Sequence, residues 1–151
     1  MKSFDLIDDL ARLIESEWAP GAKASVTVAE DPAHALDLLS AGRAGGCALV
    51  LFYLSDSPDG EEFAEDTRLD AQLRIGIVQQ PGLKLRDGKS APPVLRVVDS
   101  FRAWMSGQDL DGLLDSSLAY KGMTHIPSGA GSALHGYALT YGALYAYDTE
   151  E

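Results

Sequence analysis

Hydrophobic and polar positions follow two contrasting patterns in the middle of the chain. The run from Cys47 to Leu54 holds eight apolar residues rich in strand formers, which predicts a strand covered on both faces. Between Arg68 and Gln79, apolar side chains alternate with mostly polar ones, which predicts a strand with one face in the core and one in water. The intervening segment, residues 55–67, is predicted to be an acidic loop.

Helical spacing of apolar residues marks three further segments. A stripe between Phe4 and Trp18 predicts a first helix, which Pro20-Gly21 is expected to stop. Asp31-Pro32 is an N-cap followed by proline at the first helical position, so a second helix is expected from there to Gly42. A third follows Pro92-Pro93, with apolar residues at helical spacing up to Met105.

Three more strands complete the expected fold. They cover residues 25–28, 117–126 and 132–147, and the last two flank a segment rich in proline and glycine, as in a hairpin. The predicted order is therefore α-β-α-β-β-α-β-β. This order indicates a single α+β domain over residues 1–151, with a mixed, mainly antiparallel β-sheet and helices packed on one face.

The last predicted strand has two faces of different character. Tyr137, Tyr141 and Tyr145 share one parity, whereas small residues dominate the other. Tyrosines are enriched at protein interfaces, so one hypothesis places this row in a subunit contact. The alternative is an aromatic layer of the core whose hydroxyls reach the rim.

The excess of acidic over basic residues limits the classes of partner that the protein is expected to bind. The 151 residues carry 12 basic and 23 acidic side chains, a formal charge of −11, which disfavours binding to nucleic-acid phosphates or to an anionic membrane surface. No segment approaches the roughly 18 apolar residues of a membrane span, and the N-terminus lacks the pattern of a signal peptide. We expect a cytoplasmically made protein with no membrane partner and no sequence-specific nucleic-acid binding.

The motifs that resemble chemical sites fail on spacing or context. The segment from Gly82 to Ser90 has one residue too many for a phosphate-binding P-loop, and prolines follow it. The three histidines form no helical metal pair, and the lone Cys47 is expected to be a buried, inert thiol. We therefore expect no enzyme activity, no metal and no cofactor.

The arrangement as a whole resembles the tail terminator (tail-completion) proteins of long-tailed bacteriophages and prophages. The resemblance rests on the order of these features: an amphipathic helix (Phe4 to Trp18), the apolar strand (Cys47 to Leu54), the acidic loop, the alternating strand (Arg68 to Ile77), a helix with Phe101 and Trp104-Met105, and a tyrosine-rich C-terminal β-pair.

This resemblance implies a non-enzymatic structural protein that forms a homo-hexameric ring on the end of the tail tube. Such a ring ends tail polymerisation and offers a docking surface to the head–tail connector protein, first in the host cytoplasm and then in the virion neck. A cyclic ring needs two complementary patches on each subunit. One expected patch is the tyrosine row or an exposed strand edge. The other is the water-exposed face of the alternating strand (Arg68, Asp70, Gln72, Arg74).

The acidic loop would then face the tail tube or a DNA-conducting lumen, through Asp56, Asp59, Glu61, Glu62, Glu65 and Asp66. The basic segment with Lys84, Arg86 and Lys89 has no place in this scheme. Two alternatives remain open: a head–tail connector or neck protein of the same particle, and a small intracellular ligand-binding domain or enzyme with a deep apolar pocket.

Overall fold

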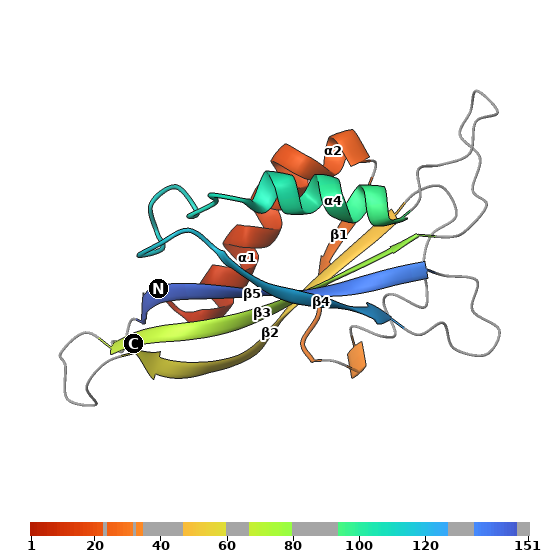
Figure 1. Ribbon diagram of the computed structural model, residues 1–151. Coiled ribbons are helices and arrows are strands. Elements are labelled where there is room, and N and C mark those ends of the chain that lie inside the picture. Colours follow the sequence, from red (N-terminus) through yellow and green to blue (C-terminus); the bar gives the residue numbers. More distant parts are fainter. Residues whose placement is uncertain are drawn as a thin grey trace, which may run out of the picture.

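Five strands form one mixed sheet whose order is β1-β2-β3-β5-β4 (Figure 1). The computed structural model describes residues 1–22, 24–31, 33–34, 47–59, 67–79, 94–126 and 135–147, with the backbone alone at positions 59, 67 and 135. The strands are β1 (Ala24–Val28), β2 (Cys47–Asp59), β3 (Thr67–Gln79), β4 (Ala119–Ile126) and β5 (His135–Tyr147). Only the β1–β2 pair is parallel, and the other three pairs are antiparallel, so the α+β fold and its order agree with the sequence prediction.

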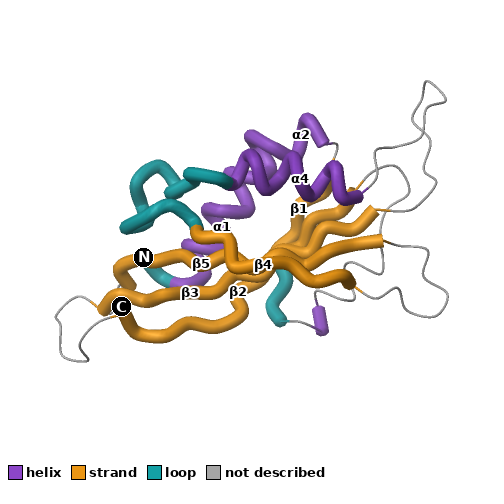
Figure 2. Tube along the Cα trace, in the orientation of Figure 1, coloured by secondary structure: helices purple, strands orange, loops and turns teal. Residues whose placement is uncertain are grey.

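The helices α1 (Ser3–Leu13), α2 (Ala19–Ala22) and α4 (Val94–Met105), with the π-helix η1 (Ile14–Trp18), cover one face of the sheet (Figure 2). Their apolar sides meet alternate residues of the strands in one core, which includes Leu10, Leu51, Ile75 and Leu139 at 0% exposure. The indole of Trp18 lies edge-on to Phe101 at 5.0 Å between ring centroids. This contact joins the N-terminal helical segment to α4 above the sheet.

The first helical segment continues past the predicted stop. Its hydrogen bonding widens to a π-helix from Ile14, and the chain stays helical through Pro20 and Gly21 to Ala22. Pro20 follows the π-helix almost at once, so its missing amide falls where the regular α-helical hydrogen-bond ladder is already interrupted. The expectation that Pro20-Gly21 ends the helix was therefore wrong by two residues.

The chain leaves β1 toward the face opposite the helices. Ala29 packs there in a second apolar cluster with Val50, Phe52 and Val78. The Asp31 carboxylate accepts a hydrogen bond from the His34 amide at 2.8 Å, as the predicted N-cap requires. The rest of that predicted helix lies outside the described residues.

Strand β2 is longer than its apolar run. The prediction ended it at Leu54, but β2 continues to Asp59 past an irregularity at Leu54 and pairs with β3 as far as Arg68. Because β1 reaches only Leu51, β2 is an edge beyond that point, and an edge tolerates Pro58. The first residues of the expected acidic loop are thus strand residues.

Candidate functional site

A row of polar side chains on β3 points away from the helices. Arg68, Asp70 and Gln72 are exposed, whereas the residues between them, Leu69 and Ala71, lie on the core side. The predicted alternation is therefore confirmed from Arg68 to Arg74, whereas Ile75 to Gln79 are buried on both faces, so the expected water-exposed face does not extend along the whole strand. The residues proposed for one side of a subunit contact lie on a face that none of the described helices covers.

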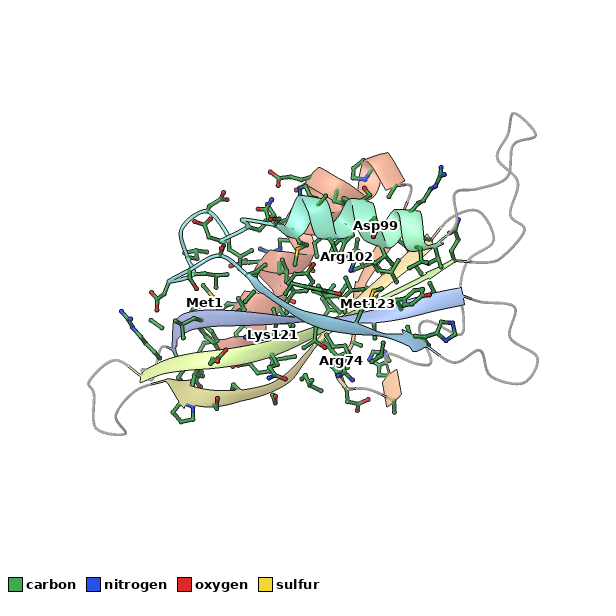
Figure 3. All side chains as sticks on the ribbon, in the orientation of Figure 1. Met1, Arg74, Asp99, Arg102, Lys121 and Met123 are labelled. Atoms are coloured by element: carbon green, nitrogen blue, oxygen red, sulfur yellow. The ribbon has the colours of Figure 1, made fainter. Side chains whose placement is uncertain are left out.

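The charges on this face are incompletely paired. The Arg68 Nε lies 3.4 Å from the Asp115 carboxylate. Arg74 is half-buried on the same side (Figure 3), and its Nε is buried without a hydrogen-bond partner among the described residues. The Lys121 side chain crosses the face over Gly142, where a Cβ would meet Lys121 Cε at 2.9 Å and Asp70 Oδ1 at 3.7 Å. Asp70 is the only described carboxylate on β3, and the basic side chains of Arg68, Arg74 and Lys121 lie on the same polar side of the sheet.

The tyrosine row does not lie on an open surface. Tyr141 and Tyr145 are 2% and 0% exposed under the helices, and Tyr137 is half-buried. The prediction that Tyr141 and Tyr145 lie in a subunit contact was wrong, because both side chains lie on the face of β5 that the helices cover. The structure agrees with the alternative, an aromatic core layer: Tyr141 meets Phe101 edge-on at 6.4 Å.

Hydroxyl groups of this layer reach the rim, where they form a hydrogen-bonded chain. The Tyr145 hydroxyl lies 3.0 Å from both the Ser3 Oγ and the Tyr53 hydroxyl, and the Tyr53 hydroxyl donates to Asp56 Oδ2 at 2.7 Å. Burial, followed by the hydrogen bonds to Tyr145 and Asp56, raises the pKa of Tyr53 well above its usual value. The Tyr53 phenol therefore stays neutral, and the hydrogen-bonded chain ties α1 to β2 and β5.

Two of the six acidic candidates fall on described residues. Asp56 is exposed on β2 and accepts the Tyr53 hydroxyl hydrogen bond, while Asp59 is the last residue of that strand. Glu61, Glu62, Glu65 and Asp66 lie outside the described residues, as do Lys84, Arg86 and Lys89. The role of the six acidic residues, facing the tail tube or a DNA-conducting lumen, remains a prediction.

The two edges of the sheet differ from each other. Among the described strands, β1 pairs only with β2, and β4 pairs only with β5. Strand β4 is largely exposed and has a bulge at Lys121, followed by Gly122 at φ +125°. The sequence did not identify the edges, because edge position depends on strand order, although a lone glycine within a strand pattern signals a bulge.

An open groove lies beside the N-terminal helical segment. Its volume is about 450 Å³, and its lining includes exposed Arg12, Ser16, Asp111 and Leu113. Leu110 and Asp111 line it with left-handed backbones, at φ 53° and 56°. A deep apolar pocket would have favoured the alternative of a ligand-binding domain. This groove is open and has an exposed, charged rim, so it does not support that alternative.

The described part of the chain holds neither a cluster of metal ligands nor a membrane-spanning helix. No three His, Cys, Asp or Glu side chains there are grouped to hold a metal ion. His125 packs edge-on against Tyr137 at 5.3 Å, and His135 is paired on β5 with Gln79 of β3. None of the described helices is both long and apolar enough to cross a membrane.

Comparisons with known proteins do not place the chain in a family. No protein-family model matches the chain, and neither does any curated protein.

Proposed function

We propose that this protein is a non-enzymatic ring component of a bacteriophage or prophage tail, which caps the tail tube and receives the head–tail connector. The observation that carries the proposal is the pair of unlike surfaces on one sheet. Arg68, Asp70 and Gln72 form an exposed polar face, and β4 is an exposed strand at one edge of the described sheet. A cyclic assembly requires two such different patches on each subunit.

The surface chemistry is compatible with this role. The order of the described elements agrees with the arrangement on which the resemblance rests. A formal charge of −11 also lets DNA pass without strong attachment, because attachment depends on basic groups that neutralise phosphates. The alternative of a connector or neck protein shares these surfaces and differs only in its partner.

The test begins with the mass of the purified protein in solution. A ring of six subunits has six times the 16.1 kDa mass of the monomer, and sedimentation or light scattering at several concentrations will resolve it. The protein is next mixed separately with purified tail tubes and with tailless heads, and negative-stain microscopy records which ends are capped. Capped tube ends support the terminator, capping of heads alone supports the neck protein, and binding to neither contradicts both.

A variant on the polar face makes the test specific. Asp70→Lys together with Gln72→Lys should abolish ring formation or tube capping, because it places like charges beside Arg68 and Arg74. The matched control is Asp109→Lys, which changes an exposed carboxylate in the turn after α4 and should leave assembly unchanged. Equal assembly by the two variants would exclude the β3 face from the contact.

A further inference from the structure

The two outer strands among those that the structure describes, β1 and β4, run in opposite directions. Strand β1 is parallel to β2, β2 is antiparallel to β3, β3 to β5, and β5 to β4. It follows that β4 runs antiparallel to β1 within one subunit. A second copy that continues the sheet in the same orientation would therefore bring its β1 beside β4 as an ordinary antiparallel pair.

We propose that subunits join edge to edge, β4 of one copy pairing with β1 of the next, so that one sheet continues around the assembly. This inference rests on the proposed ring and names its contact: the β1 edge takes the place of the β3 face as the partner of β4, which leaves the polar face of β3 to meet the tail tube. The two edges are different, so the contact is heterologous, and repeated rotation closes it into a ring. A pair of identical edges would instead make a closed dimer.

The faces of the two strands restrict the register. On the helix side lie Val28 of β1 and Met123 of β4, both packed against the main core. On the opposite side lie Ala29 and Ile126, both in the second cluster. A register that keeps both faces continuous can shift only in steps of two residues, because a single step would turn every side chain to the other face.

One of these registers pairs each exposed group with a suitable neighbour. With Thr27 opposite Thr124, Val28 lies opposite Met123, and Glu30, two residues past the end of β1, comes close to Lys121 in the bulge just before the regular part of β4. Thr–Thr, apolar and opposite-charge pairs are each favourable across strands. Thr27, Thr124, Glu30 and Lys121 are all exposed, and among the described residues neither Glu30 nor Lys121 forms an ion pair.

Shifting the register by two residues loses this match. One shift sets Lys121 opposite Val28, and the other sets Met123 opposite Glu30. Each places a charge against an apolar side chain. The bulge at Lys121 gives a further reason for a single register, since β4 is regular only from Gly122 onward and the pairing must begin there.

Disulfide trapping tests the contact directly. Antiparallel neighbours have Cα atoms about 4.5–5.5 Å apart, within the range that a disulfide spans. Under mild oxidation, a mixture of Thr27→Cys and Thr124→Cys proteins should form a covalent dimer, whereas neither variant alone should. The double variant should give a ladder of covalent oligomers.

Two features make this experiment clean. The only native thiol, Cys47, is buried, and burial raises its pKa to about 11, so it contributes no background. The pair Ser25→Cys with Thr124→Cys is the matched control, because it joins the same strands in the shifted register and should cross-link poorly. Dimers from a single variant, or no dimers from the mixture, would overturn the edge pairing.

Charge reversal provides the second test. Lys121→Glu and Glu30→Lys should each weaken association by up to about fivefold per contact, the size of a lost cross-strand charge pair. The combined variant should recover most of the loss. Arg96→Glu, which reverses an exposed cation on α4, is the control: it changes the net charge as much as Lys121→Glu does, so its effect should be smaller by the contribution of the broken pair.

The outcomes separate this inference from the function on which it rests. A hexamer that caps tubes but shows neither the cross-link nor the charge rescue leaves the proposed function standing and refutes the edge contact. A protein that caps neither tubes nor heads refutes the function, even where the cross-link shows that the edges pair.

Discussion

At the scale of single residues, the hydroxyl group of a buried tyrosine should contribute to stability separately from its ring. Replacing Tyr145 by phenylalanine keeps the fully buried ring but removes the hydroxyl that meets Ser3 and Tyr53. We expect the free energy of unfolding to fall by about 1 kcal/mol, the usual net worth of a hydrogen bond. Denaturant titration measures this change.

The control for this prediction is Tyr120→Phe. Tyr120 is 44% exposed, and its hydroxyl accepts a hydrogen bond from Arg102 in contact with water, so the same chemical change should cost much less. An equal loss of stability in both variants would mean that the buried hydroxyl chain contributes nothing specific.

The thiol of Cys47 should make the protein sensitive to alkali. Burial raises its pKa from 9.0 to about 11, so the unfolded chain releases this proton at lower pH than the folded chain does. The resulting stabilisation is complete below pH 9 and is lost as the pH rises through 11. Urea unfolding at pH 8, 9 and 10 should show stability falling more steeply for the native chain than for Cys47→Ala, and parallel profiles would contradict this account.

At the scale of elements, two glycines on the same face of β5 should respond differently to substitution. A Cβ at Gly136 would lie 2.8 Å from the Ile77 carbonyl oxygen and 2.5 Å from Val78 Cγ1, whereas one at Gly142 would meet the flexible end of Lys121. Gly136→Ala should therefore destabilise the protein by about 1–3 kcal/mol, the cost of overpacking. Thermal unfolding checks this value.

The matched variant is Gly142→Ala, which should change stability little because the Lys121 side chain can move aside. If Gly142→Ala were as destabilising as Gly136→Ala, the cost would come from strand flexibility or propensity and not from the close approach of β3 to β5.

The periodicity of apolar residues predicted most helices and strands but not which neighbouring elements pack against them. The alternation gave the two faces of β3 correctly from Arg68 to Arg74, because there one face is buried and the other meets water. It did not predict that both faces are buried from Ile75 to Gln79, where Val78 packs in the second apolar cluster. The same parity rule separated the tyrosines from the small residues of β5 but could not say which row the helices cover. That choice depends on how α1 and α4 pack, which involves residues far away in sequence.

The end of β2 was missed for a related reason. Polar residues such as Ser55 and Asp56 are typical of loops, and the local pattern does not show that they pair with the first residues of the strand predicted from Arg68. The β3 face of the candidate site could therefore be predicted from sequence, whereas the β1 and β4 edges could not, since strand order is a property of the whole sheet.

At the scale of the whole molecule, net charge should control assembly. Each subunit carries a formal charge of −11, so neighbouring subunits repel one another over a distance set by ionic strength. The screening length falls from about 30 Å at 0.01 M salt to about 8 Å at 0.15 M. We therefore expect the proportion of ring to rise over this interval, as measured by sedimentation velocity at one fixed protein concentration.

The salt response also separates long-range repulsion from local charge pairs. The Lys121→Glu variant adds two negative charges to each subunit by replacing a cation with an anion, so its assembly should need more salt than that of the native chain. The Glu30→Lys variant lowers the net negative charge by two, and it should show a weaker salt dependence even though it breaks the same proposed pair. Opposite shifts in these two variants would assign the salt effect to net charge. Identical shifts would assign it to the loss of the pair alone, and a native ring that dissociates steadily from 0.01 M upward would contradict the repulsion argument.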